Sequence, residues 1–161
     1  HEILPALRRA WPLICFYIVG RSPPASVLAL ASENVVVTGT VPDVRPFLQH
    51  AEVVVAPLRV ARGIQNKILE AMAMARPVVA SLSCVEAIDA EDGVELVSAT
   101  DAQDFVAQID ALLKAPLRAA AIGLSGRARV VKSYSWAAHL SGIDEHLTLK
   151  VPAISTGQEA Q

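Results

Sequence analysis

Cationic side chains and a glycine gather at one place in the sequence, directly before a predicted helix. Arg59 and Arg62 lie in the loop, Gly63 precedes the helix and Lys67 falls at its start. A glycine lets a ligand approach the backbone closely, and a helix start offers unpaired amide donors and about half a positive charge. Arginine and lysine add charge-assisted hydrogen bonds to phosphate oxygens. This combination suits a diphosphate.

Glu70 lies nearly two turns further along the same helix. It is too far from the helix start to meet the same phosphate, but its carboxylate can accept hydrogen bonds from neighbouring hydroxyls, such as those of a ribose. The alternative is an ordinary surface, in which Lys67 and Glu70 form an exposed pair worth a few tenths of a kcal/mol and the arginines are solvated. Residue chemistry alone leaves both interpretations open.

The helix that carries these residues is expected to begin near Gly63 or Ile64. It should stop by Arg76, because Pro77 disfavours helical dihedral angles in the residue before it. One apolar stripe at helical spacing should face the core. Its members are Ile64, Ile68, Leu69 and Met72.

Five short apolar segments are predicted to be strands, at residues 13–19, 35–38, 53–56, 77–81 and 94–97. They alternate with helical segments, and further helices are predicted at 102–114, 117–133 and 136–147. This order predicts an α/β fold: a Rossmann-like parallel sheet of about five strands, with helices on both faces and at the C-terminal end. Residues 1–150 should form one domain, and 151–161 a disordered tail.

Short polar side chains before the predicted helices are candidate N-caps, since their oxygens can accept hydrogen bonds from the first amides of a helix. Ser22 is a possible cap for a helix at 25–31, and Asp43 is a cap or first-turn acid for a helix at 43–50. Asp101 or Thr100 can cap the helix at 102–114.

Composition excludes several classes of function. The chain has 161 residues, a formal net charge of -2 and a pI near 6.1, so no general nucleic-acid-binding surface is expected. No apolar run approaches the roughly 18 residues of a membrane span, and no secretory signal pattern is seen. Cys15 and Cys84 are expected to be buried or inert thiols in a reducing cytoplasm. The basic residues of the late helix are read as a solvated face: Arg118, Arg127, Arg129 and Lys132.

Four further kinds of site are excluded. None of the predicted strand ends carries a carboxylate, as a phosphate-accepting receiver domain would need. Neither G-x-G-x-x-G nor a P-loop is present, and the four histidines are scattered, so no metal site is expected.

Several motifs, in order, resemble the nucleotide-sugar-binding lobe of retaining glycosyltransferases of the GT-B fold, family four. The most specific piece is EAMA at 70–73, followed by RPVVAS at 76–81. Other pieces agree: YIVG at 17–20, VTGTVPD at 37–43, VVVAP at 53–57 and YSW at 134–136. The similarity spans roughly residues 10 to 148.

The resemblance implies transfer of a sugar from a nucleotide-diphosphate donor with retained anomeric configuration, in polysaccharide or glycoconjugate assembly. It implies that Glu70 binds the donor ribose, that the 41–43 loop lies against the base largely through its backbone, and that the 63–66 loop lies by the diphosphate and sugar. No cofactor is expected beyond this donor, and no catalytic residue is assigned. The donor-binding residues expected are Gly20, Arg21, Val41, Pro42, Asp43, Arg62, Gly63, Ile64, Gln65, Asn66, Lys67 and Glu70.

Arg62 departs from the family pattern, which usually has a glutamate at this position in contact with the donor sugar. Arginine accepts no hydrogen bond, so it cannot play the same role. The hypothesis is that Arg62 binds a donor phosphate or an acidic sugar group. Donor affinity that stays unchanged in both Arg62→Ala and Arg62→Glu would remove it.

The resemblance also implies partners that this sequence does not contain. The acceptor-binding N-terminal lobe is absent, as is the first strand of the donor lobe, which is central in the family's sheet. The chain is therefore expected to close its sheet without that strand, to borrow one, or to dimerise through exposed edges. Catalysis by this chain alone is not expected. The location expected is cytoplasmic, with the whole protein peripheral to the inner face of the membrane. The alternative function is a non-catalytic nucleotide-binding or interaction module.

Overall fold

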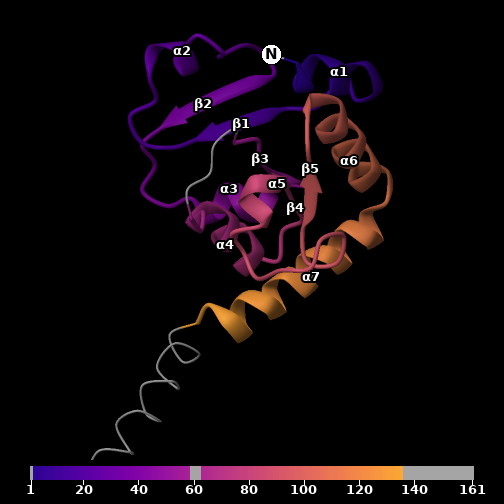
Figure 1. The fold of residues 1–161 in the computed structure, drawn as a ribbon. Helices are drawn as coiled ribbons and strands as arrows, with labels where there is room; N and C mark the ends of the chain where they lie inside the picture. The colour runs from indigo at the N-terminus through magenta and orange to yellow at the C-terminus, as the bar shows by residue number, and fades with distance from the viewer. Residues whose placement is uncertain (1, 59–62, 136–161) are drawn as a thin grey trace, which may run out of the picture.

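The computed structural model describes residues 2–58 and 63–135. In this part of the chain, helices and strands alternate as the sequence predicts, and the order begins α1 (Ile3–Ala10), β1 (Phe16–Val19), α2 (Ala25–Leu28), β2 (Val35–Gly39), α3 (Arg45–His50) and β3 (Val54–Ala56). It continues with α4 (Asn66–Ala73), β4 (Val78–Ser81), α5 (Leu82–Val85), β5 (Val97–Ala99), α6 (Ala102–Lys114) and α7 (Pro116–Ser133). The α/β class is confirmed (Figure 1).

All five strands are parallel, but they form two sheets. β1 pairs with β2, and β3, β4 and β5 form a second sheet in that order. Among the described residues, β1 and β3 each have a partner strand on one side only. Closure of one sheet by the chain itself, one of the three expected alternatives, is therefore not seen in the described residues. No further described segment has the strand pattern needed to connect the two sheets.

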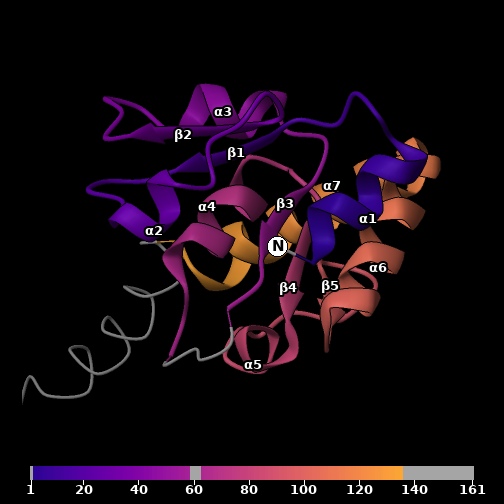
Figure 2. The same cartoon turned by 90° about the horizontal axis from the view of Figure 1, so that it is seen from above.

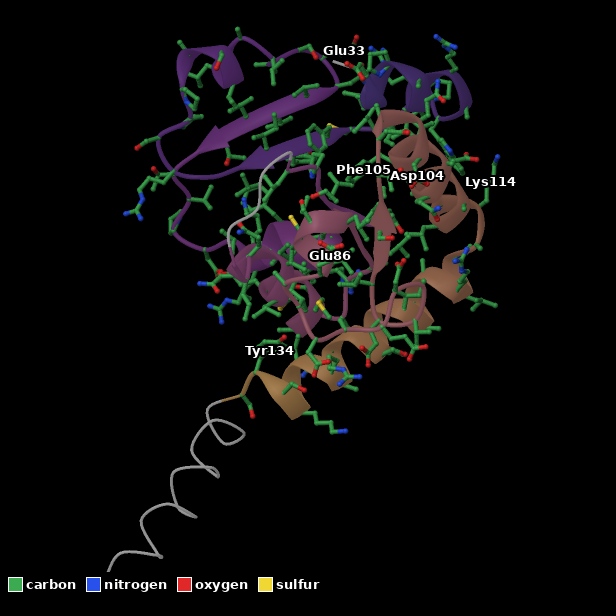
Figure 3. The ribbon with its side chains drawn as sticks, viewed as in Figure 1. Glu33, Glu86, Asp104, Phe105, Lys114 and Tyr134 are labelled. Carbon is green, nitrogen blue, oxygen red and sulfur yellow. The ribbon has the colours of Figure 1, made fainter. Side chains whose placement is uncertain are left out.

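The three-stranded sheet is covered by helices on both faces, as predicted. Successive strand residues point to opposite faces. Val78 and Ala80 of β4 pack with Ile68 and Met72 of α4, whereas Val79 between them packs on the other side. That side carries Leu7 of α1, Phe105, Ile109 and Leu112 of α6, and Ala119 and Ile122 of α7. Figure 2 shows β4 between α4 and α6, and Figure 3 shows Phe105 on the side of α6 that faces the sheet.

Helix α6 is fixed by its cap and by a link to α1. The Asp101 carboxylate accepts a hydrogen bond from the Asp104 amide at 2.9 Å, which confirms the predicted N-cap. Near the other end, Asp110 accepts hydrogen bonds from Lys114 at 2.6 Å and from the Trp11 indole at 2.9 Å. These donors lower the pKa of Asp110. The start of the chain is thereby held against the helix that covers the sheet.

Helix α7 crosses close to α4 because two of its buried positions are glycines. A Cβ at Gly123 would lie 2.2 Å from the carbonyl oxygen of Ala75, and one at Gly126 would lie 2.5 Å from that of Glu95. Both distances are shorter than any side chain tolerates, so only glycine allows this approach. The two residues hold α7 against the loops that precede β4 and β5.

Polar contacts hold the C-terminal half of α7 in the same place. Nε of Arg129 donates to both carboxylate oxygens of Glu95, at 3.0 and 2.9 Å, and Arg127 donates to the carbonyl of Ala73 at 3.1 Å. At the end of α7, the hydroxyl of Tyr134 accepts a hydrogen bond from the Asp89 amide at 2.8 Å (Figure 3). The interpretation of this face as solvated is therefore wrong for Arg129, which is partly buried against Glu95, whereas Arg127 stays exposed.

Helix α4 ends in a Schellman motif without the usual glycine. The amide of Arg76 donates to Ala71 and that of Ala75 to Met72, at 3.0 and 2.9 Å. The residue between, Ala75, has φ of 54°, a left-handed conformation that is unfavourable for a residue with a Cβ.

Ala75→Gly is expected to stabilise the protein by about 1 kcal/mol, because glycine adopts this conformation without strain. The midpoint of thermal unfolding should rise by about 3 °C. Ala121→Gly is the matched control. Ala121 is exposed in the middle of α7, where the same exchange should destabilise by about 1 kcal/mol. Equal shifts of the same sign in both variants would contradict the role of the backbone angle.

Two boundaries differ from the sequence prediction for local reasons. The fifth strand is Val97–Ala99, three residues later than expected, because residues 91–96 form a turn in which the Gly93 amide donates to the Leu96 carbonyl. Helix α2 begins after Pro24, and no side chain caps it, so the proposed cap at Ser22 is wrong.

Cys84 is buried as expected, whereas Cys15 is exposed. Within the described residues, no helix is long and apolar enough to cross a membrane.

Candidate functional site

The start of α4 has most of the features expected of a phosphate site, although the helix begins later than predicted. Its first residue is Asn66, so Gly63 and Ile64 lie in the preceding loop. Gly63 has φ of 67°, and Gln65 occupies the N-cap position without a side-chain cap. Ile64 is 48% exposed and is not part of the buried stripe, which corrects its predicted place. Asn66 and Lys67 are exposed in the first turn, where the helix presents its amide donors.

Glu70 lies one turn after Asn66 and is exposed, whereas Ile68, Ala71 and Met72 of the same helix are buried. The buried residues fix the rotation of α4 against the sheet. Glu70 consequently points away from the core. The predicted separation between a polar face and an apolar face is confirmed for this part of the helix.

The loop after β2 is held by an ion pair. Both carboxylate oxygens of Asp43 accept hydrogen bonds from Nε of Arg45 at 3.0 Å, and Oδ1 also accepts from the Arg45 amide at 2.9 Å. The side-chain hydrogen bonds lower the pKa of Asp43 and raise that of Arg45. The predicted N-cap position is taken by Val44, so Asp43 stabilises the start of α3 from one residue further out. A ring contact between Phe47 and Tyr17, with centroids 6.1 Å apart, places α3 against β1.

A hollow of about 370 Å³ lies between α3 and α4. Figure 1 shows these helices next to each other. The polar residues that line it are Asp43, Arg45 and Glu70, and its apolar lining consists of Val44, Leu48, Ala73 and Met74. Two residues predicted from separate motifs, Asp43 and Glu70, are thus brought to one place by the tertiary structure. A second hollow of about 360 Å³, between α1 and α6, contains none of the predicted residues.

The other predicted residues are not among those that line this hollow. Gly20 and Arg21 follow β1 and are exposed. Val19 pairs with Gly39, so Gly20 leaves the two-stranded sheet at the same edge as the segment that leads to Val41 and Pro42. Residues 63–65 directly precede the helix that carries Glu70, and Asn66 and Lys67 are its first two residues. Arg62, like Arg59, falls outside the described residues.

Two contributors escape sequence reasoning. Arg45 lines the hollow, and its spacing of two residues from Asp43 is the only local signal for the pair. Ser81, at the end of β4, donates to the carbonyl of Leu58 at 2.7 Å and so joins the ends of β3 and β4. This bond fixes the chain at Leu58, directly before residues 59–62. No sequence pattern indicates a contact between positions 23 residues apart.

The arrangement can bind an anion and hydroxyl groups with its own side chains and amides. Lys67 and the amides of the first turn of α4 can donate to phosphate oxygens, and Glu70 can accept from hydroxyls. Among the residues that the structure describes, no three His, Cys, Asp or Glu side chains lie together as metal ligands would.

Comparison with protein families gives one match. A family model described as glycosyl transferases group 1 matches residues 1–115. No curated protein matches the chain.

Solved structures share the fold at low sequence identity. HepE of Anabaena, solved in complex with UDP-glucose, is 20% identical with a TM-score of 0.77, and the match covers 92% of this chain and 44% of HepE. TarM of S. aureus is 22% identical with a TM-score of 0.74, over 92% of this chain and 31% of TarM. Sucrose-phosphate synthase of Thermosynechococcus elongatus is 21% identical with a TM-score of 0.73, over 93% and 43%. The chain therefore spans less than half the length of these proteins.

Proposed function

Because the chain belongs to the group 1 glycosyl transferases, we propose that it is the donor-binding lobe of a retaining glycosyltransferase that uses a nucleotide-diphosphate sugar. The fold supports the C-terminal lobe of a GT-B enzyme as its place in the whole protein. In this proposal the acceptor is bound by an N-terminal lobe, and the whole enzyme serves polysaccharide or glycoconjugate assembly in the cytoplasm. The 161-residue chain binds the donor but does not complete the transfer.

The hollow between α3 and α4 carries the proposal. It brings Asp43, from the loop expected at the base, next to the helix that bears Glu70, the residue expected at the ribose. A nucleoside that contacts the loop and the helix together would need these two elements to be neighbours. Unrelated surface residues have no reason to converge in this way.

The geometry supports distinct roles for the residues around the hollow. The carboxylate of Asp43 is engaged by Arg45, so contact with a base falls to the backbone of Val41 and Pro42. The exposed first turn of α4 receives the diphosphate, with Gly63 allowing close approach and Lys67 supplying charge. Gly20 and Arg21, which follow β1, are proposed to contribute to the same donor site. Arg62 is proposed to bind a phosphate or an acidic sugar group.

UDP is the first ligand to test, because HepE was solved with UDP and with UDP-glucose. A ligand that binds only the folded state adds about 2.7 kcal/mol at a hundred times its dissociation constant. For a protein of this size, the unfolding midpoint should then rise by roughly 5 to 10 °C. Differential scanning fluorimetry with UDP, ADP, GDP, CDP and TDP measures this shift.

Uridine and UMP are the controls for the phosphate part of the site. If uracil is the preferred base, uridine and UMP should raise the unfolding midpoint less than UDP does, since they lack the β-phosphate expected at the start of α4. A midpoint that no nucleoside diphosphate changes would contradict the donor-binding proposal.

The alternative, a non-catalytic module of the same fold, is favoured by the arginine at position 62 in place of the family's usual glutamate. Donor binding does not distinguish this module from the lobe of an active enzyme, because both would bind the donor. Turnover of the bound donor by the whole protein does distinguish them. Dimerisation through the free edges of β1 and β3 is a further proposal. A chain that sediments as a monomer throughout the micromolar range would contradict it.

A further inference from the structure

The outward face of α7 carries an apolar stripe that the fold does not cover. Leu117, Leu124 and Val131 are 88%, 64% and 59% exposed, and they recur every seven residues. Ala121 and Ala128, also exposed, fill the positions between them. At 100° per residue these five side chains fall within an arc of about 80°. The glycines and Ile122 that pack on the protein lie on the opposite face, so α7 is apolar on both sides.

Basic residues border this stripe on both sides. Arg118 and Lys132 lie along one border and are exposed, and neither forms an ion pair within residues 2–58 and 63–135. Arg127 lies along the other border and is exposed. The sequence of α7 contains no Asp or Glu. An apolar stripe between basic borders is the pattern of a helix that lies in the surface of a membrane.

We propose that the outer face of α7 docks on an anionic lipid surface. The helix lies parallel to the membrane with Leu117, Leu124 and Val131 inserted among the acyl chains. Arg118 and Lys132 extend their long side chains towards the lipid phosphates, as such residues do at membrane interfaces. Arg127, which donates to the Ala73 carbonyl, adds its positive charge along the other border. Figure 1 shows α7 along one edge of the molecule, away from β1 and β2.

Charge decides between this partner and a second copy of the chain. Two α7 helices packed stripe to stripe would bring only basic residues together, because neither helix has an acid to pair with them. An anionic membrane offers negative charge along the whole length of the helix. A nucleic-acid backbone would bind the basic residues through their charge but would offer no apolar surface to the stripe.

Vesicle flotation of the 161-residue chain tests the proposal. The chain should float with vesicles of phosphatidylcholine mixed with phosphatidylglycerol, and about a hundred-fold less with phosphatidylcholine alone, since its cations then lose their partner. The charge variant Arg118→Gln/Lys132→Gln should bind the mixed vesicles about thirty-fold more weakly. The stripe variant Leu117→Gln/Leu124→Gln/Val131→Gln should lose about a hundred-fold. Circular dichroism checks that each variant is folded.

Matched variants elsewhere on the surface control for net charge and hydrophobicity. Arg8→Gln/Arg9→Gln changes the charge equally on α1, and Leu13→Gln removes a leucine that is 94% exposed. Both should float like the unchanged chain. The proposal is overturned if the chain floats with neither vesicle, if it floats equally with both, or if the charge and stripe variants bind as well as the controls. If the unchanged chain and the other variants are dimers and only the stripe variant is a monomer, a second copy of the chain is the partner instead. None of these outcomes depends on nucleotide binding.

Discussion

Replacing Gly123 by alanine is expected to lower the free energy of unfolding by about 3 kcal/mol, the upper end for overpacking of a buried site. The added Cβ would lie 2.2 Å from the carbonyl oxygen of Ala75 and 2.8 Å from its carbonyl carbon. Those are backbone atoms, and they belong to the Schellman motif that ends α4, so no side-chain rotation relieves the overlap. α7 would have to move away from α4.

Thermal and urea unfolding measure this effect, and the midpoint of thermal unfolding should fall by about 10 °C. Gly20→Ala is the control, because a Cβ added at Gly20 would have no atom within 4 Å and the φ of this residue is not in the left-handed region. It should change the free energy of unfolding by no more than about 0.5 kcal/mol. If both variants unfold at the same midpoint, the close crossing of α7 and α4 does not contribute to stability.

Glu70→Ala is expected to weaken UDP binding about thirty-fold while leaving the fold intact. The proposed role gives Glu70 charge-assisted hydrogen bonds to the ribose hydroxyls, and losing them should remove about 2 kcal/mol. Glu70 is exposed, so its loss should change the free energy of unfolding by less than about 0.5 kcal/mol. Isothermal titration calorimetry measures the dissociation constant directly.

Glu33→Ala is the matched control for the carboxylate. Figure 3 shows Glu33 near the N-terminal helix, away from α4, and it is also exposed. UDP affinity should be unchanged in this variant. Unchanged affinity in Glu70→Ala would contradict the ribose assignment, yet it would leave the donor-binding proposal standing if UDP still binds.

A cycle with 2′-deoxy-UDP identifies the group that Glu70 contacts. If the carboxylate accepts from the 2′-hydroxyl, the unchanged protein should bind 2′-deoxy-UDP more weakly than UDP. Glu70→Ala should then bind the two ligands with equal affinity. Two losses that add fully would mean that Glu70 and this hydroxyl act independently.

Local sequence predicted most of the secondary structure because the relevant signals are local. Short apolar runs predicted all five strands, and Asp101 predicted the start of α6 through a cap that the structure contains. The predictions failed where a neighbouring interaction decides the outcome. Ile64 fits the helical spacing of α4, yet the chain turns at Gly63 and leaves it exposed. The fifth strand begins late because the turn at Gly93 takes up its first residues.

The site was predictable in its residue types but not in its assembly. Gly63, Lys67 and Glu70 are identified by helix position and charge, and the structure places them on α4 or just before it. The wall formed with α3 was not predictable, because Asp43 and Glu70 are 27 residues apart and meet only through the packing of two helices. The contacts of Arg45 and Ser81 correspond to no periodic pattern in the sequence, so the sequence did not predict them.

The sequence by itself determined the α/β class, the order of the elements and the chemistry available at the start of α4, since these follow from the composition and spacing of neighbouring residues. Only the tertiary structure decided three other features. Strand pairing divided the five strands into two sheets, Gly123 and Gly126 brought α7 onto the loops before β4 and β5, and the packing of α3 beside α4 formed the hollow. The physical reason is the same in each case: hydrogen bonds and close contacts between distant segments depend on where the whole chain places them, and local propensity carries no information about that.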